Sequence, residues 1–338
     1  MSRAPIRIGL LGAGRIGRMH ARLVARQVPG LALAAVHDVD ADATATVAQE
    51  LDVAASASAE ELMARPDVDA IAICSSTDTH VDLLVAATST GKPVFLEKPV
   101  SLDLAEVDRG LAAAERAEMY VQIGFNRRYD PAHRSVRDAV ASGEVGDVHL
   151  LRLSSRDPAS PPLEYIRLSG GIFLDMTAHD FDLARFVTGS EVEEVYARGE
   201  VRIDPAIEQE GDFDTAVVTL RHADGTLTAI DNSRRAVYGF DQRVEAFGSK
   251  GVAVSENPLA HTGFVRTADG TRAAALPYFF LERYTSSYLA EWGAFEHAVR
   301  AGEPSPVPLQ EGRAALVVGL AAEHSARERG PARVADFR

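Results

Sequence analysis

Short hydrophobic runs alternate with amphipathic segments over the first 124 residues. Ile6–Leu11 and Leu31–Val36 have the length and branched composition of buried strands, and Arg18–Gln27 between them has helical composition and is stopped by Pro29-Gly30. Further helices are expected over residues 41–51, 59–64, 81–89 and 102–117, and further strands over 68–74, 92–96 and 120–124. Strands that alternate with helices in this way predict a parallel, doubly wound sheet of the Rossmann type.

The pattern changes after Gly124. Residues 215–221 and 226–233 flank the turn sequence Ala223-Asp224-Gly225, and residues 242–247 and 252–255 flank Gly248–Gly251, so both pairs read as hairpins. Helices are expected over residues 131–141, 289–300 and 311–329. The fold class is therefore α/β, with a Rossmann domain in residues 1–124 and an α+β domain in residues 125–338. The second domain is expected to hold a large, open, mostly antiparallel sheet.

The first expected strand runs directly into Gly12-Ala13-Gly14-Arg15-Ile16-Gly17. A strand, this glycine spacing and a helix together favour a dinucleotide site over a chance match. Gly12 permits a tight turn, Gly14 lets the backbone approach a pyrophosphate, and Gly17 lets the helix and strand pack closely. The N-terminus of the helix that follows offers N–H groups and a positive dipole end to the pyrophosphate, and Arg15 and Ile16 of the motif are further candidate cofactor-binding residues.

Asp38 follows Gly17 by 21 residues, at the tip of the second expected strand. An acidic residue at this place accepts hydrogen bonds from the adenosine ribose, and it repels a 2′-phosphate. No arginine or lysine occurs between Ala32 and Leu51 to bind such a phosphate. The sequence therefore predicts NAD rather than NADP as the cofactor, with a turn or helix-capping role for Asp38 as the alternative.

Polar residues also follow the later strands of the first domain. Ser75-Ser76-Thr77 and His80 come after residues 68–74, and Glu97-Lys98-Pro99 comes after residues 92–96. Ligands of doubly wound sheets bind outside the carboxyl ends of the strands, so we expect these loops to line the cofactor crevice. His80 could instead only orient its loop, and Lys98 could be a solvated surface lysine.

Asp175 and His179, four residues apart in Gly170–Asp182, are the candidates for proton transfer. If this segment is one helix, both side chains lie on one face, one turn apart. An imidazole titrates near neutral pH, and a neighbouring carboxylate can orient it and stabilise its charged form. The alternative is a solvated acidic helix with a satisfied histidine in the core.

Composition narrows the possible partners. Of the 338 residues, 46% are hydrophobic and 25% charged, which is ordinary for a soluble globular protein, and the net charge is −14. Without a basic stripe, nucleic acid and anionic membrane surfaces are not expected as partners. The single cysteine, Cys74, lies in an apolar run and fits a core position in a cytoplasmic protein. No secretory signal, membrane-spanning segment or metal site is expected, because long apolar runs and clusters of histidine or cysteine are missing.

A dinucleotide fold, a Glu-Lys-Pro at a strand end and a DxxxH in a second domain occur together here. With these motifs the chain resembles the Gfo/Idh/MocA family of sugar and polyol dehydrogenases, over nearly its whole length. Within the family the resemblance is greatest to the inositol dehydrogenases. The stretches that carry this finer match are GFNRRYDP at residues 124–131, SGGIFLDMTAHDFDLARF at 169–186 and NSRRAVYGFDQRVEAFGSKG at 232–251.

The resemblance implies roles for the candidate residues. Lys98 would touch both the substrate hydroxyl and the nicotinamide site, His179 would be the catalytic base, and Asp175 would support it. Arg128 and Tyr238 match positions that contact the cyclitol. Alcohol oxidation needs a base for the O–H proton and a donor that steadies the developing alkoxide, and histidine and lysine suit these two tasks.

Family members often have a cis peptide bond before the proline of the Glu-Lys-Pro motif, here Pro99. One subgroup carries HRNP where this chain has Ser155-Arg156-Asp157-Pro158, so the substrate contacts and the isomer preference should differ. Asp157 is kept as a candidate substrate-binding residue, with a surface pair of Arg156 and Asp157 as the alternative.

The implied reaction is NAD-dependent oxidation of a secondary hydroxyl of a cyclitol, with myo-inositol and its 2-keto product as the first choice. Another inositol isomer or an aldose is the alternative substrate. A non-catalytic NAD-sensing regulator is the competing class, and the joint presence of Lys98, Asp175 and His179 argues against it, since a sensor needs no proton relay. The resemblance also implies a homotetramer.

Overall fold

The computed structural model describes residues 4–338, which form two compact units. Unit 1 comprises the chain up to Asn126 together with Ser287–Ala314, and unit 2 comprises Arg127–Ser286 and Ala315–Arg338. The first crossing lies two residues from the boundary expected after Gly124. The expectation that all of residues 125–338 belong to the second domain is corrected for Ser287–Ala314, because Trp292 and Phe295 are part of the hydrophobic core of unit 1.

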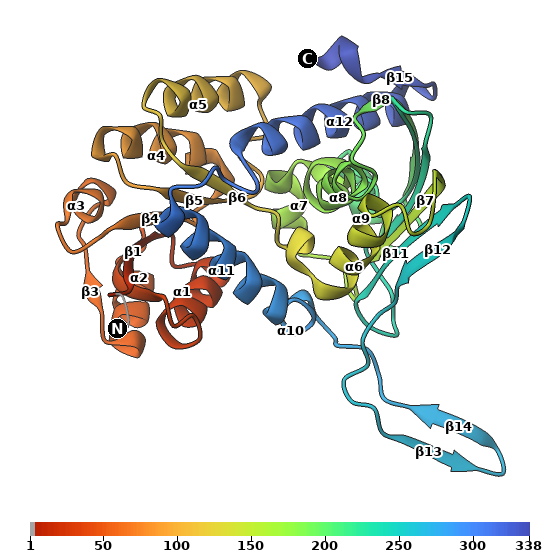
Figure 1. Ribbon diagram of the computed structural model, residues 1–338, viewed down its shortest axis with the longest axis horizontal. Helices are drawn as coiled ribbons and strands as arrows, with labels where there is room; N and C mark the ends of the chain where they lie inside the picture. The colour runs from red at the N-terminus through yellow and green to blue at the C-terminus, as the bar shows by residue number, and fades with distance from the viewer. Residues whose placement is uncertain (1–3) are drawn as a thin grey trace. The chain divides into compact units, whose positions relative to one another are not determined.

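Unit 1 is built on a six-stranded sheet in the order β3-β2-β1-β4-β5-β6, and every adjacent pair is parallel (Figure 1). The strands are β1 (Ile6–Leu11), β2 (Leu31–His37), β3 (Ala54–Ala55), β4 (Ala70–Ile73), β5 (Val94–Glu97) and β6 (Val121–Gly124). This is the doubly wound parallel sheet predicted from the sequence, with the short β3 as an additional edge strand. Such a sheet is covered on both faces, which explains why β4, β5 and β6 are buried at every position.

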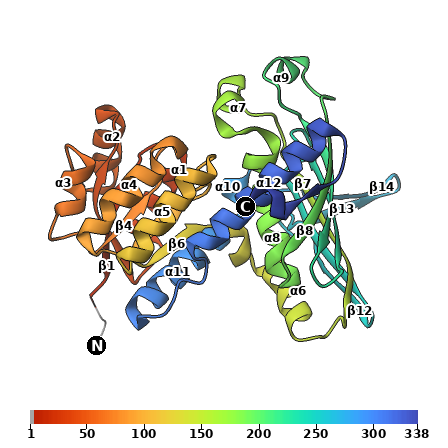
Figure 2. The same ribbon diagram turned by 90° about the horizontal axis from the view of Figure 1, so that it is seen from above.

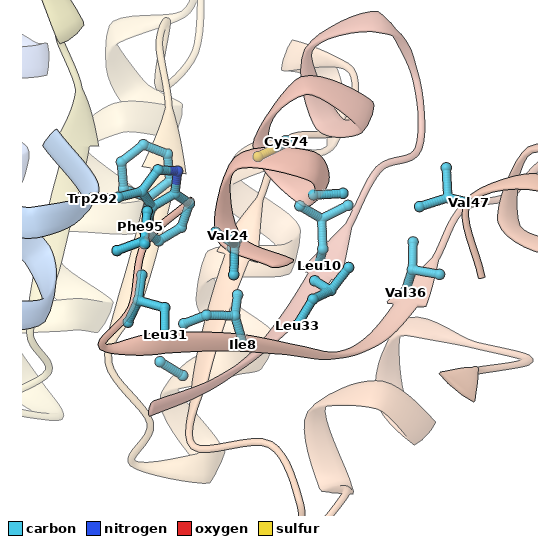
Figure 3. Close-up of a cluster of buried hydrophobic side chains, with 14 of the residues drawn as sticks. Ile8, Leu10, Val24, Leu31, Leu33, Val36, Val47, Cys74, Phe95 and Trp292 are labelled. Carbon is cyan, nitrogen blue, oxygen red and sulfur yellow. The ribbon is translucent and has the colours of Figure 1, made fainter. Parts of the chain in front are cut away.

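Helices pack on both faces of this sheet. Side chains of α1, α2 and α11 join one hydrophobic cluster with β1 and β2, and Figure 3 shows Trp292 of α11 against Phe95 in that cluster. Cys74 belongs to the same cluster, as expected of a core residue. In Figure 1, α4 and α5 lie on the opposite side of the sheet from α1 and α2. The helices of unit 1 are α1 (Arg15–Arg26), α2 (Ala41–Leu51), α3 (Ala59–Ala64), α4 (His80–Ala87), α5 (Leu104–Arg116) and α11 (Thr285–Ala301), with short 3₁₀ turns η1 (Thr77–Thr79) and η2 (Thr88–Thr90).

Unit 2 contains a seven-stranded sheet in the order β12-β11-β7-β10-β9-β8-β15. Among the described strands of this sheet, only the β10–β7 pair is parallel, so the sheet is mixed and mostly antiparallel, as predicted. The two expected hairpins form as β9–β10 and β11–β12. The strands are β7 (Val148–Arg156), β8 (Val192–Glu200), β9 (Thr215–His222), β10 (Leu227–Ser233), β11 (Asp241–Gly248), β12 (Gly251–Ser255) and β15 (Ala332–Arg333).

Helices α6 and α8 pack together and against this sheet, and Figure 2 shows the helices of unit 2 on one side of it. The helical elements are η3 (Asn126–Tyr129), α6 (Pro131–Ala141), α7 (Leu163–Ser169), η4 (Ile172–Met176), α8 (Ala178–Thr188), α9 (Pro205–Gln209), α10 (Phe280–Arg283), α12 (Leu309–Glu328) and η5 (Val334–Phe337). Hairpin β13 (Phe264–Thr267) and β14 (Gly270–Ala273) was not expected and extends away from the sheet (Figure 1). No helix within residues 4–338 is long and apolar enough to cross a membrane.

Candidate functional site

Among the three glycines of the first turn, Gly12 and Gly17 have the steric roles that their spacing predicts. Gly12 has φ +99°, and a β-carbon there would lie 2.5 Å from the backbone of Cys74. A β-carbon at Gly17 would lie 1.9 Å from the carbonyl oxygen of Gly12, so helix and turn can meet only at a glycine. At Gly14, by contrast, a β-carbon would have no described atom within 4 Å. Gly12 and Gly17 are therefore required by the fold, whereas the space at Gly14 suits a ligand that approaches the backbone.

The amino terminus of α1 fits an anion. Gly14 is the N-cap residue, no side chain caps this helix end by a hydrogen bond, and the first turn contains no acidic residue. Arg15 and Ile16 open the helix, three residues earlier than expected, so the helix starts directly after the glycine turn. N–H groups and the positive helix dipole at this end suit the pyrophosphate of a dinucleotide.

Asp38 directly follows β2 and is hydrogen-bonded to the glycine turn. Its Oδ2 accepts a hydrogen bond from the backbone N–H of Ala13 at 2.6 Å, and its Oδ1 accepts one from that of Asp40 at 2.9 Å. The carboxylate has further lone pairs that can accept hydrogen bonds from a ribose. Asp38 thus combines the turn-forming role that was the alternative with a fixed carboxylate at the position expected for ribose recognition.

The loops after β4 and β5 are held together by His80. Its ring nitrogens lie 2.8 Å from the carbonyl oxygen of Pro99 and 3.1 Å from that of Ser75. Burial lowers the pKa of His80, so the ring is neutral and its single N–H can donate to one of the two carbonyls at a time. Ser75 also bonds through its hydroxyl to Thr79 at 2.7 Å. These contacts favour the loop-orienting role of His80. Its contact with a cofactor, and those of Ser76 and Thr77, stay predictions.

Glu97 ends β5, and the Lys98–Pro99 peptide bond after it is cis, as the family resemblance implied. One Glu97 oxygen, Oε2, accepts a hydrogen bond from the backbone N–H of Lys98 at 3.0 Å. The other, Oε1, lies 2.7 Å from Nε2 of His20. Lys98 is therefore held through its backbone at the carboxyl end of a central strand, where ligands of such sheets bind.

In unit 2 the segment that was expected to be one helix is divided. Residues Ile172–Met176 form the π-helical turn η4, in which the Thr177 N–H donates to the Ile172 carbonyl, and α8 begins only at Ala178. Asp212 holds the start of the turn by accepting the Ile172 N–H at 2.9 Å. The simple argument that Asp175 and His179 lie one α-helical turn apart is thus corrected. π-Helical turns occur frequently at functional sites.

Asp175 and His179 are both half-buried, and they lie on η4 and α8, respectively. Asp175 Oδ1 accepts a hydrogen bond from the Tyr165 hydroxyl at 3.0 Å. Tyr165 is therefore a residue that sequence reasoning missed: it fixes the carboxylate that was assigned to support His179. The catalytic roles of Asp175 and His179 stay predictions.

Next to His179, Asp180 is buried in a polar network that anchors α8 on the sheet. Its Oδ1 accepts hydrogen bonds from Arg127 and Ser155, each at 2.8 Å, and its Oδ2 accepts one from Asn232 at 2.8 Å. Burial raises the pKa of Asp180, while the neighbouring Arg127 charge acts in the opposite direction. The network fixes the helix that presents His179. The sequence contained one indication of this network, a polar residue at a core-facing strand position. Asn232 alternates in phase with the buried Thr228 and Ile230.

Arg128 has buried partners within unit 2. Its Nε lies 2.9 Å and its Nη2 lies 2.6 Å from the two carboxylate oxygens of Asp182, and its guanidinium lies over the ring of Phe186. A bidentate pair of this kind holds the loop before α6 on α8. A contact between Arg128 and a cyclitol stays a prediction, and the pair gives this arginine a structural role that the sequence did not indicate.

The last two candidates lie at the end of β7 and after β10. Burial raises the pKa of Asp157 to about 6, against the attraction of the Arg127 charge and with the repulsion of the Asp175 charge. The Tyr238 hydroxyl donates to Asp241 at 2.6 Å and accepts from Arg156 at 3.0 Å, and the ring is 51% exposed. The Asp175 charge therefore contributes to the raised pKa of Asp157, whereas Tyr238 is hydrogen-bonded in a cluster with Arg156.

Two family models match this arrangement. The model described as an oxidoreductase family with an NAD-binding Rossmann fold matches residues 6–125, and the GFO/IDH/MocA C-terminal domain matches residues 133–254. The chain belongs to the Gfo/Idh/MocA oxidoreductase family. The glycine turn, the open end of α1 and Asp38 are therefore parts of an NAD-binding domain.

Known relatives match this chain over nearly its whole length. Myo-inositol 2-dehydrogenase of Thermotoga maritima is 48% identical over 96% of this chain and 97% of its own length. The solved structure of a probable dehydrogenase from T. maritima superimposes with a TM-score of 0.96 at 46% identity, covering 98% of this chain and all of that one. Scyllo-inositol dehydrogenase of Lactobacillus casei, solved with NAD(H) and scyllo-inositol, gives a TM-score of 0.91 at 27% identity, covering 98% and 99% of the two chains.

Proposed function

We propose that this family member is an NAD-dependent inositol dehydrogenase that oxidises a secondary hydroxyl of myo-inositol to the 2-keto product. The observation that carries the proposal is that unit 1 contains the features of a cofactor site and unit 2 contains the candidate base. Unit 1 has an open glycine turn, an uncapped helix end and a fixed acidic residue after β2. Unit 2 has a histidine on a helix that a buried network anchors. The relatives named for inositol oxidation match both units.

The proposed chemistry divides between Lys98 and His179. His179 accepts the hydroxyl proton of the substrate, and Asp175, itself held by Tyr165, orients the imidazole and stabilises its charged form. Lys98 donates to the same oxygen as negative charge develops on it. When bound, NAD supplies the hydride acceptor that alcohol oxidation requires. Arg128, Asp157 and Tyr238 are the proposed contacts to the other hydroxyls, and a different isomer or an aldose is the alternative substrate.

The test is NADH absorbance on mixing the full-length protein and NAD with a panel of polyols. We expect turnover of myo-inositol, or of another inositol isomer, to exceed that of sorbitol and glucose. His179→Ala should lower kcat by about 10²–10⁴-fold, the usual contribution of a positioned base, with little change in NAD affinity. The exposed His261 provides a control, since His261→Ala should leave kcat unchanged. Equal turnover of sorbitol, or near-normal kcat in a folded His179→Ala variant, would contradict the proposal.

We also propose a homotetramer in the cytoplasm that binds no nucleic acid. Strand register places a set of apolar side chains on one face of the unit 2 sheet, and each is 42–55% exposed: Tyr196, Val217, Leu227, Phe247, Val252 and Val254. An exposed apolar face of this kind is typical of a surface that binds another protein. For the proposed homotetramer, light scattering should give four times the mass of one chain, and a monomer would contradict both the tetramer and this use of the face.

A further inference from the structure

A continuous chain of buried hydrogen bonds leads from α11 to the backbone of Lys98. The Trp292 indole N–H donates to Nδ1 of His20 at 2.9 Å, and Nε2 of His20 lies 2.7 Å from Oε1 of Glu97. The other Glu97 oxygen accepts the Lys98 N–H at 3.0 Å. Trp292 and His20 are 0% exposed and Glu97 is 8% exposed. All four residues belong to unit 1, although Trp292 lies far along the chain from the other three.

The direction of each hydrogen bond follows from the chemistry of Trp292, the first residue of the chain of hydrogen bonds. An indole nitrogen can only donate, so Nδ1 of His20 must accept and carries no hydrogen. The single hydrogen of a neutral imidazole is then on Nε2, which donates to Glu97. The contact between His20 and Glu97 is therefore a hydrogen bond from a neutral ring to a carboxylate. Both ring nitrogens of His20 are used, so the tautomer is fixed by Trp292.

Two buried carboxyl groups lie in this region, and their hydrogen-bond partners differ. Glu97 accepts hydrogen bonds from His20 and from the Lys98 backbone. Glu291 is 0% exposed, and within residues 4–338 no donor reaches either of its carboxyl oxygens. Burial and the neighbouring Glu97 raise the pKa of Glu291 well above its usual value, which favours the neutral form of Glu291.

Aromatic packing restrains the side chains that form this chain of hydrogen bonds. Trp292 stacks on Phe95 with ring centroids 4.4 Å apart, and Phe95 lies two residues before Glu97 on β5. His20 meets Phe95 edge-on at 5.3 Å. On β6, a β-carbon at Gly124 would lie only 3.0 Å from the carboxyl carbon of Glu97, so the glycine leaves the space that this side chain fills. The Glu97 carboxylate therefore has one well-defined position.

We propose that Trp292 and His20 are positioning residues for the reaction, acting through Glu97 to hold the Lys98 peptide and so to aim the Lys98 side chain. The inference rests on the proposed role of Lys98 at the reacting hydroxyl. Neither Trp292 nor His20 touches the substrate. Their effect is on the precision with which the lysine is placed, and a misplacement of about 1 Å can cost about 10²-fold in rate.

Four variants separate positioning from packing. Trp292→Phe keeps an aromatic ring against Phe95 and removes the N–H donor together with part of the ring volume. His20→Leu removes both hydrogen bonds, whereas His20→Gln keeps an N–H where Nε2 donates to Glu97. Phe295→Leu is the matched control, because Phe295 is equally buried and packs edge-on against Trp292 at 5.4 Å without a place in the chain.

The kinetic test uses NAD and whichever polyol the wild type oxidises fastest. Trp292→Phe should lower kcat about 10-fold and His20→Leu about 10²-fold, with the NAD dissociation constant changed less than about threefold. His20→Gln should recover most of the loss. The deuterium isotope effect on the oxidised carbon should rise in the slow variants, because hydride transfer becomes rate-limiting. Phe295→Leu should lower Tm and leave kcat and the isotope effect unchanged.

The tautomer gives a second readout that needs no turnover. Nitrogen-15 NMR of the full-length protein, with the His20 signal assigned from His20→Gln, should show Nε2 protonated and Nδ1 unprotonated. A protonated Nδ1, or equal kcat in Trp292→Phe and Phe295→Leu, would overturn the inference. If the wild type oxidises no polyol of the panel, the proposed function fails, and the role assigned to Trp292 and His20 in that reaction falls with it. A normal tautomer signal in that case would leave the hydrogen-bond chain as a structural feature only.

Discussion

Replacing Asp38 by serine and Val39 by arginine should move cofactor preference from NAD toward NADP. Val39 is 97% exposed, so a longer side chain there displaces nothing. Arginine would supply a bidentate partner for a 2′-phosphate, and loss of Asp38 would remove its repulsion. The structure adds a cost that the sequence did not indicate: Asp38 Oδ2 accepts the Ala13 N–H at 2.6 Å, and serine is too short to replace it.

The two effects have separable magnitudes. A hydrogen bond to a charged group contributes about 1.5–3 kcal/mol when its loss leaves the partner unsatisfied, so Asp38→Ser should lower Tm by several degrees. Repulsion between two unit charges at about 4 Å amounts to about 1 kcal/mol in water and about 4 kcal/mol at an effective dielectric constant near 20. Because Asp38 is only partly buried, we expect a value toward the lower limit, about a tenfold change in the NADP to NAD ratio from charge removal alone.

Asp38→Asn is the control that separates charge from geometry. Asparagine keeps a carbonyl oxygen for the Ala13 N–H and removes the negative charge, so its Tm should stay near that of the wild type while the cofactor ratio shifts. The assay is kcat/KM for NAD and for NADP, by absorbance of the reduced cofactor, together with Tm for each variant. Wild-type efficiency with NADP equal to that with NAD would refute the reasoning. So would an Asp38→Ser variant with unchanged Tm and unchanged cofactor ratio.

Three further predictions follow from contacts in single units. Gly14→Ala should keep the wild-type Tm but weaken NAD binding measured by fluorescence. Gly17→Ala should instead unfold unit 1, since its β-carbon would lie 1.9 Å from a carbonyl oxygen. Equal Tm for the two variants would contradict this prediction. Arg128→Ala should cost about 3–5 kcal/mol in chemical denaturation, because it removes the bidentate partner of the buried Asp182 carboxylate, and additional replacement of Asp182 by alanine should restore part of the loss. A loss of activity with unchanged stability would instead favour the substrate role of Arg128. Because the pKa of Asp157 is raised to about 6, the protein should lose stability as the pH rises from about 4 to 6. Asp157→Asn should therefore raise Tm above pH 6 but not below pH 4. A stabilisation independent of pH would refute the assignment.

The sequence alone determined the local elements and the cofactor domain. Helices α2 and α3 have the predicted bounds, and the two hairpins of unit 2 form at the predicted turns. Period and turn chemistry are local properties, so neighbouring residues encode them. The steric roles of Gly12 and Gly17 were also predictable, because a turn between a parallel strand and its helix has a fixed geometry.

Only the tertiary structure decided the contacts between distant residues. The return of Ser287–Ala314 to unit 1 depends on Trp292 and Phe295 filling the core beside Phe95. No local pattern distinguishes a helix that packs on the preceding sheet from one that packs on a more distant one, since both need only an apolar face.

The same reason applies to the polar groups. Asp180 and His20 look like ordinary surface residues of amphipathic helices, yet both are buried and fully engaged. A buried polar side chain is stable only where partners meet it, and those partners, Asn232 and Trp292, come from other elements of the same unit. The division of Gly170–Asp182 into a π-helical turn and a helix likewise depends on Asp212, which lies far along the chain. The sequence therefore identified the candidate functional residues. The fold decided which groups hold them in place, because hydrogen bonds and packing act across space rather than along the chain.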